Sequence, residues 1–393
     1  MQKQQVKMRV LDYGKDCEEN FYNNFFIQIL QKKYDIVYSD KPDFIIYGPF
    51  GHDHLKYDCV RIFQTGENIR PDYNIADYSI DYDYIDFEDR HLRVPYIFWT
   101  SYDEQQQDEM DNRVKWLNKK EKFCGFVVSN KALTHKRDMF FEALSKYKRV
   151  DSGGRWKNNI GGNVDDKIEW LKSYKFNICF ENGSHPGYLT EKLFDAFLAG
   201  CVPIYWGDTS LRVHKNTCAD SKNSENINNR GGGGNDTFDM RIPNISHSLI
   251  EYEINPKAFI NAHNFPTFQD LIEEIKRIDN DSYAFEEMLR EPIFLNNFSP
   301  YEFYTEQISA FLDHIIMQGA NDAKRCGDGY QLRTYWEFTC AYARDRRFLL
   351  IFSIIVRNIR NSFKDTVIFL SFLETLCVFY AESRVDLRIY NCK

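Results

Sequence analysis

Short apolar runs and a longer amphipathic run alternate along the first part of the chain. The apolar runs have the length and the β-branched and aromatic content of strands; they are MRVLDY (8–13), YDIVYS (34–39), DFIIYG (43–48) and VRIFQTG (60–66). Between the first two, residues 18–32 place apolar side chains at helical spacing and predict one helix. Strands that alternate with helices indicate an open α/β sheet.

A second unit of the same kind follows a charged stretch that ends near residue 122. Its predicted strands and helices are CGFVVSN (124–130), HKRDMFFEALSKY (135–147), SYKFNICFEN (173–182), LTEKLFDAFLAG (189–200) and CVPIYWG (201–207). Gly200 follows the last apolar position of the second helix and predicts its end. We therefore divide the chain into a first α/β domain over 1–122 and a second over 123–319.

Two segments depart from this pattern. Residues from about 212 to 248 are polar and rich in Gly and Asn, and we expect a disordered insertion there. Residues 320–393 carry 12 Lys plus Arg and 8 Asp plus Glu, a net charge of +4 against −12 for the residues before them. The apolar runs of this tail are shorter than the roughly 18 residues of a membrane span. We expect partly amphipathic helices, which either lie on an anionic membrane surface or pack on the body or on a second copy in a homodimer.

Composition and charge exclude some functions. A net charge of −8 over 393 residues argues against nucleic acid as a partner. The 10 cysteines include no C-x-x-C pair and no spacing typical of zinc sites, which favours a reducing compartment. Residues 1–14 lack the apolar run of a signal peptide. We therefore expect a cytoplasmic protein, in peripheral contact with the inner face of a membrane if the tail binds there.

The segment FENGSHPGYLTEK (180–192) joins a predicted buried strand to the beginning of a predicted helix. In α/β folds this position presents free backbone N–H groups and the positive end of the helix dipole to phosphate groups. Lys192 adds a positive charge, and Glu191 could accept hydrogen bonds from ribose hydroxyls. The pattern therefore indicates a site for a nucleoside diphosphate. The alternative interpretation is a capped helix, with Thr190 near the N-cap.

The run FENGSHPGYLTEKLFDAFLAGCVPIYWGD closely resembles the signature of the α-1,3/α-1,4-fucosyltransferases, glycosyltransferase family ten, in its bacterial type. That signature contains Phe-Glu-Asn, then Tyr-x-Thr-Glu-Lys, then Val-Pro-(Ile/Val)-Tyr-Trp-Gly, in this order. The resemblance extends through RIFQTGENIRPDYN, VDSGGRWKNNIGG and INPKAFINAHNF, over about residues 60–316, and excludes the insertion and the tail.

The resemblance implies a GT-B fold, with two Rossmann-like domains facing across a cleft. The first would hold the acceptor sugar and the second GDP-fucose. The residues that match donor-binding positions of the family are Lys157, Glu181, Asn182, Tyr188, Glu191 and Lys192. At Lys157 the relatives carry arginine, so this chain keeps the charge there but loses the bidentate fork.

Glu67, in QTGEN, lies at the family's proposed base position and follows a predicted strand. The resemblance implies inverting transfer, in which a carboxylate takes the proton of the acceptor hydroxyl. Without the resemblance, Glu67 would be interpreted as a solvated loop residue. The departing diphosphate would be stabilised by the helix N-terminus, Lys192, and Lys157 or Arg155, so we expect no metal and no cofactor besides the donor substrate.

Other polar residues have weaker patterns. The segment from Asp81 to Asp89 is acidic and rich in tyrosine, and we interpret it as an acceptor-side surface; the alternative is buried tyrosines with solvated acids. We expect His185 and His135 to be surface or hydrogen-bonded residues without a catalytic role, and Trp206 to belong to the core.

We therefore expect an enzyme that moves L-fucose from GDP-β-L-fucose to N-acetylglucosamine in a lactosamine-type glycan, with the α-1,3 linkage favoured. Two alternatives stay open. One is a related transferase with another nucleotide sugar, because a phosphate site does not distinguish the base or the sugar. The other is an inactive glycan-binding protein, if the insertion distorts the donor pocket.

Overall fold

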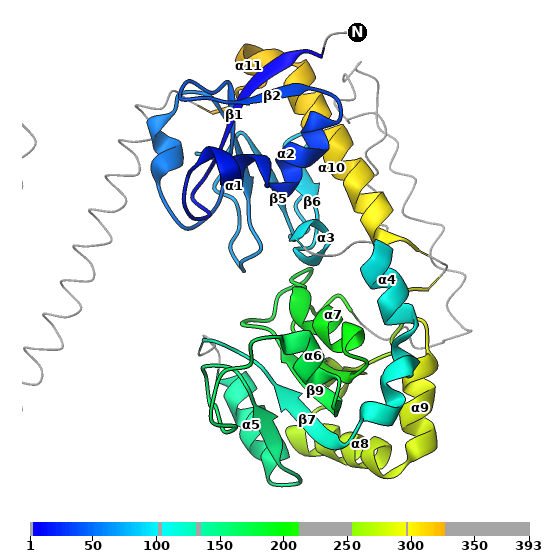
Figure 1. Ribbon diagram of the computed structural model, residues 1–393. Helices are drawn as coiled ribbons and strands as arrows, with labels where there is room; N and C mark the ends of the chain where they lie inside the picture. The colour runs from blue at the N-terminus through cyan, green and yellow to red at the C-terminus, as the bar shows by residue number, and fades with distance from the viewer. Residues whose placement is uncertain (1–2, 101–103, 131–134, 212–253, 296–297, 327–393) are drawn as a thin grey trace, which may run out of the picture. The chain divides into compact units, whose positions relative to one another are not determined.

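The computed structural model describes residues 3–100, 104–130, 135–211, 254–295 and 298–326, which carry two parallel sheets (Figure 1). The expected insertion and nearly all of the expected tail lie outside these ranges. In the part of the chain that is described, no helix is long and apolar enough to cross a membrane.

The first sheet has six strands among the described residues, in the order β2-β1-β3-β4-β5-β6, and all neighbours are parallel. They are β1 (Gln5–Leu11), β2 (Asp35–Tyr38), β3 (Phe44–Tyr47), β4 (Val60–Gln64), β5 (Tyr78–Asp81) and β6 (His91–Arg93). The central strands β3 and β4 are buried along their whole length, which is why they are continuous apolar runs in the sequence. The expected open α/β sheet is confirmed, with β5 and β6 as strands that the apolar pattern did not predict.

The predicted helix over 18–32 is wrong in one respect, because it is two helices. α1 (Glu18–Tyr22) ends before Asn24, whose side chain accepts hydrogen bonds from the backbone N–H groups of Phe26 and Ile27 at 3.0 and 3.4 Å. Asn24 thus caps α2 (Phe25–Gln31), and the cap interrupts what the apolar spacing presents as one run. The chain continues through η1 (Asp53–Lys56), α3 (Ile97–Thr100), α4 (Glu104–Asp111) and η2 (Arg113–Lys119).

The second sheet has five parallel strands in the described ranges, in the order β11-β10-β9-β7-β8. They are β7 (Lys122–Phe126), β8 (Val150–Ser152), β9 (Tyr174–Phe180), β10 (Val202–Trp206) and β11 (Ile260–Asn261). The helices of this part are α5 (Lys136–Ser145), α6 (Lys167–Leu171), α7 (Glu191–Leu198), η3 (Ala262–Asn264), α8 (Phe268–Asn280) and α9 (Ser282–Arg290). Gly200 follows α7 at φ +65°, which confirms the predicted end of that helix.

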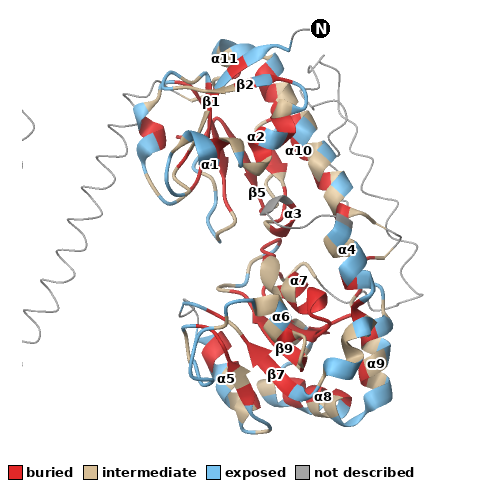
Figure 2. Cartoon of the chain, in the orientation of Figure 1, coloured by how far each residue is buried: buried red, intermediate tan, exposed pale blue. Residues whose placement is uncertain are grey.

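Both faces of the second sheet are buried, as the strands drawn in red in Figure 2 show. Successive side chains of a strand point to opposite faces. Accordingly Ile178 and Ile204 pack into a core with residues of α5, α8 and α9, whereas Cys179 and Tyr205 join a second core that contains α7. This two-sided burial fixes the loops at the carboxyl ends of β9 and β10.

The last described helices, α10 (Pro300–Met317) and α11 (Gly319–Asp322), correct the predicted domain boundary at 319. α10 packs on α2, α3 and β6 of the first sheet (Figure 1), and its buried side chains share one core with that sheet. Residues 300–319 therefore belong with the first domain, although they follow the second in sequence.

The segment after α11 is fastened to the amino end of β5. The buried carboxylate of Asp77 accepts hydrogen bonds from the backbone N–H groups of Arg325 and Cys326, at 2.7 and 2.6 Å. Its other oxygen accepts from the backbone N–H of Arg61 at 2.8 Å, and the Arg61 side chain is itself buried. The first residues of the expected tail are thus part of the first domain.

Candidate active site

Residues 181–190, which we call the donor loop, connect β9 to α7 at the carboxyl edge of the second sheet. Three hydrogen bonds fasten the loop to the end of β10. The Glu181 N–H donates to the Trp206 carbonyl at 2.8 Å, the Ser184 hydroxyl to the Gly207 carbonyl at 2.7 Å, and the Gly187 N–H to Asp208 at 2.7 Å. The loop therefore holds its shape in front of the N-terminus of α7.

Glu181 is fully buried, and its carboxylate organises the base of the donor loop. It accepts hydrogen bonds from the N–H of Thr190 at 2.9 Å and from the Thr190 hydroxyl at 2.7 Å. Thr190 occupies the N-cap position of α7, as expected, but its hydroxyl donates to Glu181 rather than capping the helix. The N–H groups of the first turn are therefore not occupied by the Thr190 side chain.

Lys192 lies between two carboxylates. Its Nζ is 3.0 Å from Glu181 Oε2 and 3.2 Å from Glu191 Oε1, and its side chain is 14% exposed. Burial disfavours its charge, but the carboxylates of Glu181 and Glu191 raise the pKa of Lys192 well above the usual range. Lys192 is thus a fixed positive charge at the beginning of α7. The Glu191 side chain is 37% exposed and open to a ligand.

Tyr188 and Asn182 have different surroundings within the donor loop. Tyr188 is 2% exposed, and its ring packs edge-on against Tyr82 of the first domain, with centroids 5.1 Å apart. Asn182 is half-buried and accepts a hydrogen bond from Nη1 of Arg137 at 3.1 Å. The structure therefore brings five of the expected donor residues into one loop and helix terminus: Glu181, Asn182, Tyr188, Glu191 and Lys192.

Arg137, on the first turn of α5, is a site residue that the sequence pattern missed. Its side chain is 1% exposed, and its Nε has no hydrogen-bond partner among the described residues. Burial lowers the pKa of Arg137, while the carboxylates of Asp138 and Glu181 oppose that effect. A buried guanidinium with an unused donor beside the donor loop suits a phosphate oxygen. In the sequence, Arg137 is one arginine in a predicted amphipathic helix, and most arginines at such positions are solvated. The sequence pattern therefore gave no reason to select it.

Lys157 does not join this group. Its Nζ pairs with Glu142 Oε1 of α5 at 2.5 Å, and it makes no hydrogen bond or ion pair with the donor loop in the described part of the chain. Arg155 is exposed. Arg137 therefore contacts the donor loop through Asn182, whereas Lys157 pairs with Glu142.

Glu67 lies in the loop that follows β4, at the carboxyl edge of the first sheet. Its N–H donates to Thr65 Oγ1 at 2.9 Å, and its carbonyl accepts from Ile69 N–H at 2.7 Å, so the turn is well fixed. Burial first, and then the charges of Glu181, Glu67 and Glu191, raise the pKa of Tyr188 in the donor loop.

Two further contacts join the Glu67 loop to the donor loop. The Asn68 side chain accepts a hydrogen bond from the Tyr82 hydroxyl at 2.7 Å, and its Nδ2 would lie 2.7 Å from a Cβ placed on Gly183. Arg70 Nη2 lies 3.4 Å from His185 Nε2. The structure thus brings together the expected base loop and the expected donor residues, with His185 as a hydrogen-bonded residue.

The interpretation of residues 81–89 as an acidic surface holds for Asp86 and Glu88, which are exposed, and is wrong for three other acids. Asp81, Asp83 and Asp89 are 0%, 2% and 5% exposed. They pair with His91, with Arg70, and with both His314 and Arg325, respectively. The alternative of solvated acids is wrong for the same three residues, because each of these carboxylates lies against a cationic or potentially cationic partner. Within the described residues no cluster of three His, Cys, Asp or Glu side chains could hold a metal ion.

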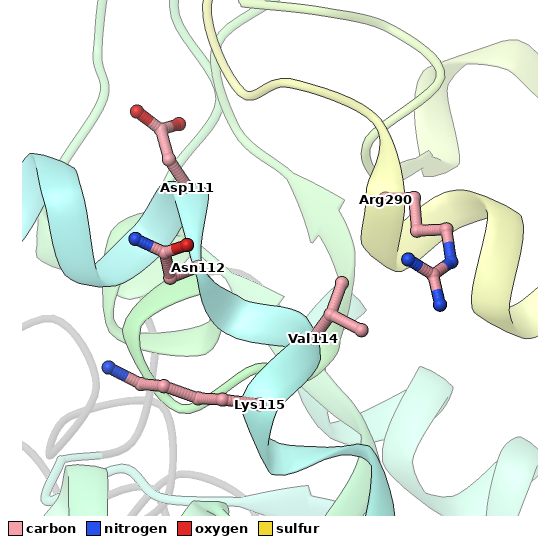
Figure 3. Close-up of a pocket in the computed structure, with 5 residues that line it drawn as sticks. All are labelled: Asp111, Asn112, Val114, Lys115 and Arg290. Carbon is pink, nitrogen blue, oxygen red and sulfur yellow. The ribbon is translucent and has the colours of Figure 1, made fainter.

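A separate concavity of about 630 Å³ lies between the α4–η2 segment and α9 (Figure 3). Asp111, Asn112, Val114, Lys115 and Arg290 line it, and the guanidinium of Arg290 pairs with Glu286 of its own helix. None of the expected site residues lines this concavity, so it is distinct from the candidate active site.

The chain has two α/β domains with parallel sheets, and the loops at the carboxyl edges of these sheets meet. Helix α10 returns to the first domain. This arrangement is a GT-B fold of the glycosyltransferase type. A family model described as the N-terminal domain of alpha-(1,3)-fucosyltransferase FucT matches residues 10–102. A second, glycosyltransferase family 10 (fucosyltransferase) C-term, matches residues 117–221. The chain belongs to glycosyltransferase family 10.

The similar curated proteins have fucosyltransferase names. An alpha-(1,3)-fucosyltransferase FucT of Helicobacter pylori is 30% identical over 325 residues, which are 73% of this chain and 60% of that protein. A putative fucosyltransferase of Acanthamoeba polyphaga mimivirus is 28% identical over 72% of this chain and 45% of its own length. The chain thus spans between 45% and 60% of the length of these relatives.

Solved structures have the same fold. A crystal structure of an alpha1,3-fucosyltransferase with GDP-fucose superimposes with a TM-score of 0.57 at 26% identity, over 80% of this chain and 91% of that one. The same kind of enzyme with GDP gives 0.58 at 27% identity, over 79% and 90%.

Proposed function

We propose that the chain is an inverting fucosyltransferase, which moves L-fucose from GDP-β-L-fucose to a hydroxyl of N-acetylglucosamine in a lactosamine-type glycan, with the α-1,3 linkage favoured. The observation that carries the proposal is the meeting of the loop after β4, which holds Glu67, with the donor loop, through Asn68 against Gly183 and Arg70 against His185. The relatives named alpha-(1,3)-fucosyltransferase and the similar structure that contains GDP-fucose support this donor. Another nucleotide sugar is the alternative, because phosphate-binding groups do not read the sugar.

Glu67 acts as the general base of the proposed reaction. Its carboxylate accepts the proton of the acceptor hydroxyl, and the acceptor oxygen forms a bond to C1 of fucose. The bond from C1 to the β-phosphate oxygen of GDP breaks at the same time, and the configuration at C1 inverts. In this arrangement the base belongs to the first domain and the donor loop to the second, and the acceptor oxygen attacks C1 from the face opposite the departing GDP.

The leaving GDP carries the electron pair of the broken bond, and cations beside it lower the barrier. The N–H groups of the first turn of α7, the fixed charge of Lys192 and the unused Nε of Arg137 are suited to this task. Glu191, whose side chain is 37% exposed, is the acceptor for the ribose hydroxyls. Our prediction that fucose transfer requires no metal ion is tested by adding EDTA to the assay.

The function of the remaining parts is proposed on sequence grounds. The first domain would hold the acceptor glycan, and the tail predicted over 320–393 would touch a membrane surface or a second copy of the chain.

Transfer of radiolabelled fucose from GDP-fucose to N-acetyllactosamine, with EDTA present, tests the proposal. Glu67→Gln and Lys192→Ala should each lower kcat by about 100-fold or more, the scale of a lost general base or charge clamp. Glu286→Gln and Lys276→Ala, which change partly exposed ion pairs on α9 and α8, are matched controls and should stay within about 2-fold. A wild-type chain that neither transfers fucose nor binds GDP would refute the proposed function.

A further inference from the structure

Phe50 is an unusual aromatic residue, because it is 67% exposed. Among the aromatic side chains whose burial the structure describes, Tyr283 on α9, at 71%, is the other one that is more than half exposed. The rest of these Phe, Tyr and Trp side chains are buried or partly buried. An aromatic ring left in water loses the stabilisation that burial would give it, so Phe50 has apolar surface available to a ligand.

The backbone around Phe50 is fixed, so its exposure does not come from a loose loop. The Phe50 N–H donates to the Asp12 carbonyl at 3.3 Å. The carboxylate of Asp12 accepts from the N–H groups of Asp53 and His54 at 3.1 and 3.2 Å, and it pairs with His54 Nδ1 at 2.6 Å. Residues 48–54 are thus tied to the end of β1, and they hold the ring of Phe50 in a defined place.

This place is beside the loop of the candidate base. β3 and β4 are parallel neighbours with Tyr47 opposite Phe63. The segments that follow these two strands therefore leave the same edge of the sheet at the same level. The Tyr13 hydroxyl donates to the Gln64 carbonyl at 2.6 Å, and a Cβ on Gly48 would lie 2.8 Å from the Tyr13 ring. Tyr13 therefore locks the two loops together. Ile69, on the Glu67 loop, is a second apolar side chain left 45% exposed.

We propose that Phe50 is an acceptor-binding residue, whose ring packs against the apolar C–H face of a pyranose in the acceptor glycan, with Ile69 extending the same contact. The inference rests on the proposed function, because it assumes that the acceptor hydroxyl meets Glu67. Pyranose rings present a face of C–H groups, and the negative face of an aromatic ring attracts them. A protein partner would bury about 800 Å² on each side, far more than one ring offers, whereas one ring matches one sugar.

The test compares Phe50→Ala, Phe50→Trp and the control Tyr283→Ala, which removes an equally exposed ring from α9. Thermal melting of each variant verifies that it is folded. Initial rates of fucose transfer give KM for N-acetyllactosamine and KM for GDP-fucose separately. Saturation-transfer NMR of N-acetyllactosamine with the same chains, in the presence of GDP, gives binding without turnover.

Phe50→Ala should raise KM for N-acetyllactosamine about 10-fold, the scale of one aromatic contact, with KM for GDP-fucose and kcat within about 2-fold. Phe50→Trp should restore the acceptor KM, and Tyr283→Ala should leave it unchanged. An acceptor KM for Phe50→Ala equal to that of Tyr283→Ala, or an equal rise of both KM values, overturns the proposal. If the wild type transfers nothing but binds lactosamine through Phe50, the proposed function fails and the Phe50 contact stands; without binding, both fail.

Discussion

The ion pair of Glu181 and Lys192 gives a sharp test of how the donor loop is held. Glu181→Gln keeps the shape of the side chain but removes its charge, and Lys192→Met removes the opposite charge. Because Glu181 is fully buried and Lys192 is 14% exposed, either change alone leaves a charge in the interior without its main partner. Breaking a buried pair in this way costs about 3–5 kcal/mol of unfolding free energy.

The magnitude for Glu181→Gln should lie near the lower limit, about 3 kcal/mol, because Glu191 remains 3.2 Å from Lys192. For Lys192→Met the loss should be about 4 kcal/mol, because Thr190 then provides the only donors to a buried carboxylate among the described residues. The double variant removes both charges. Its loss of unfolding free energy should be smaller than the sum of the two single losses by about 2 kcal/mol or more.

Urea unfolding followed by tryptophan fluorescence measures these values in a double-mutant cycle. The control cycle uses Glu286 and Arg290, an i, i+4 pair whose side chains are 37% and 61% exposed, and it should give about 0.3–0.5 kcal/mol. A coupling energy for Glu181 and Lys192 no larger than that of the control pair would show that the donor loop does not depend on this charge pair.

Two further outcomes follow from single side chains. Arg137→Lys keeps the charge but loses the unused Nε, so GDP should bind about 10-fold more weakly in isothermal titration, and unchanged affinity would contradict a phosphate contact. Burial disfavours the Asp12 carboxylate, but hydrogen bonds from His54 and from the backbone N–H groups of Asp53 and His54 lower its pKa below the ordinary 3.8. A lowered pKa stabilises the fold above the unfolded value, and this contribution is lost as the pH falls through the folded value. The stability advantage of wild type over Asp12→Asn should therefore shrink below about pH 4 in urea unfolding. An advantage that stays constant from pH 6 to pH 3 would exclude this linkage.

The central strands of both sheets could be predicted, because strands buried on both faces are continuous apolar runs. β5 and β6 could not. They are short, and they carry polar residues such as Ser79 and His91, whose burial depends on partners elsewhere in the chain. The same reason explains why Asp83 and Asp89 are buried, since their partners Arg70, His314 and Arg325 lie outside the segment 81–89.

The candidate site could be predicted where a single segment carries it. The donor loop and α7 are contiguous, and local spacing with the family signature was enough to name their residues. Arg137 and Lys157 show the limit of prediction from local sequence. Both side chains are cations near α5. Only the packing of α5 decides that Arg137 is buried beside Asn182 and that Lys157 pairs with Glu142.

The return of α10 and of residues up to Cys326 to the first sheet has a consequence for synthesis on the ribosome. At about 5–20 residues per second, Cys326 emerges roughly 10–50 s after Arg93, the end of the last strand of that sheet. During this interval the buried face that α10 covers is open, and Asp77 lacks the backbone N–H groups of Arg325 and Cys326. The domain that is made first is therefore completed last, and a nascent chain displays an apolar sheet face to which a chaperone can bind.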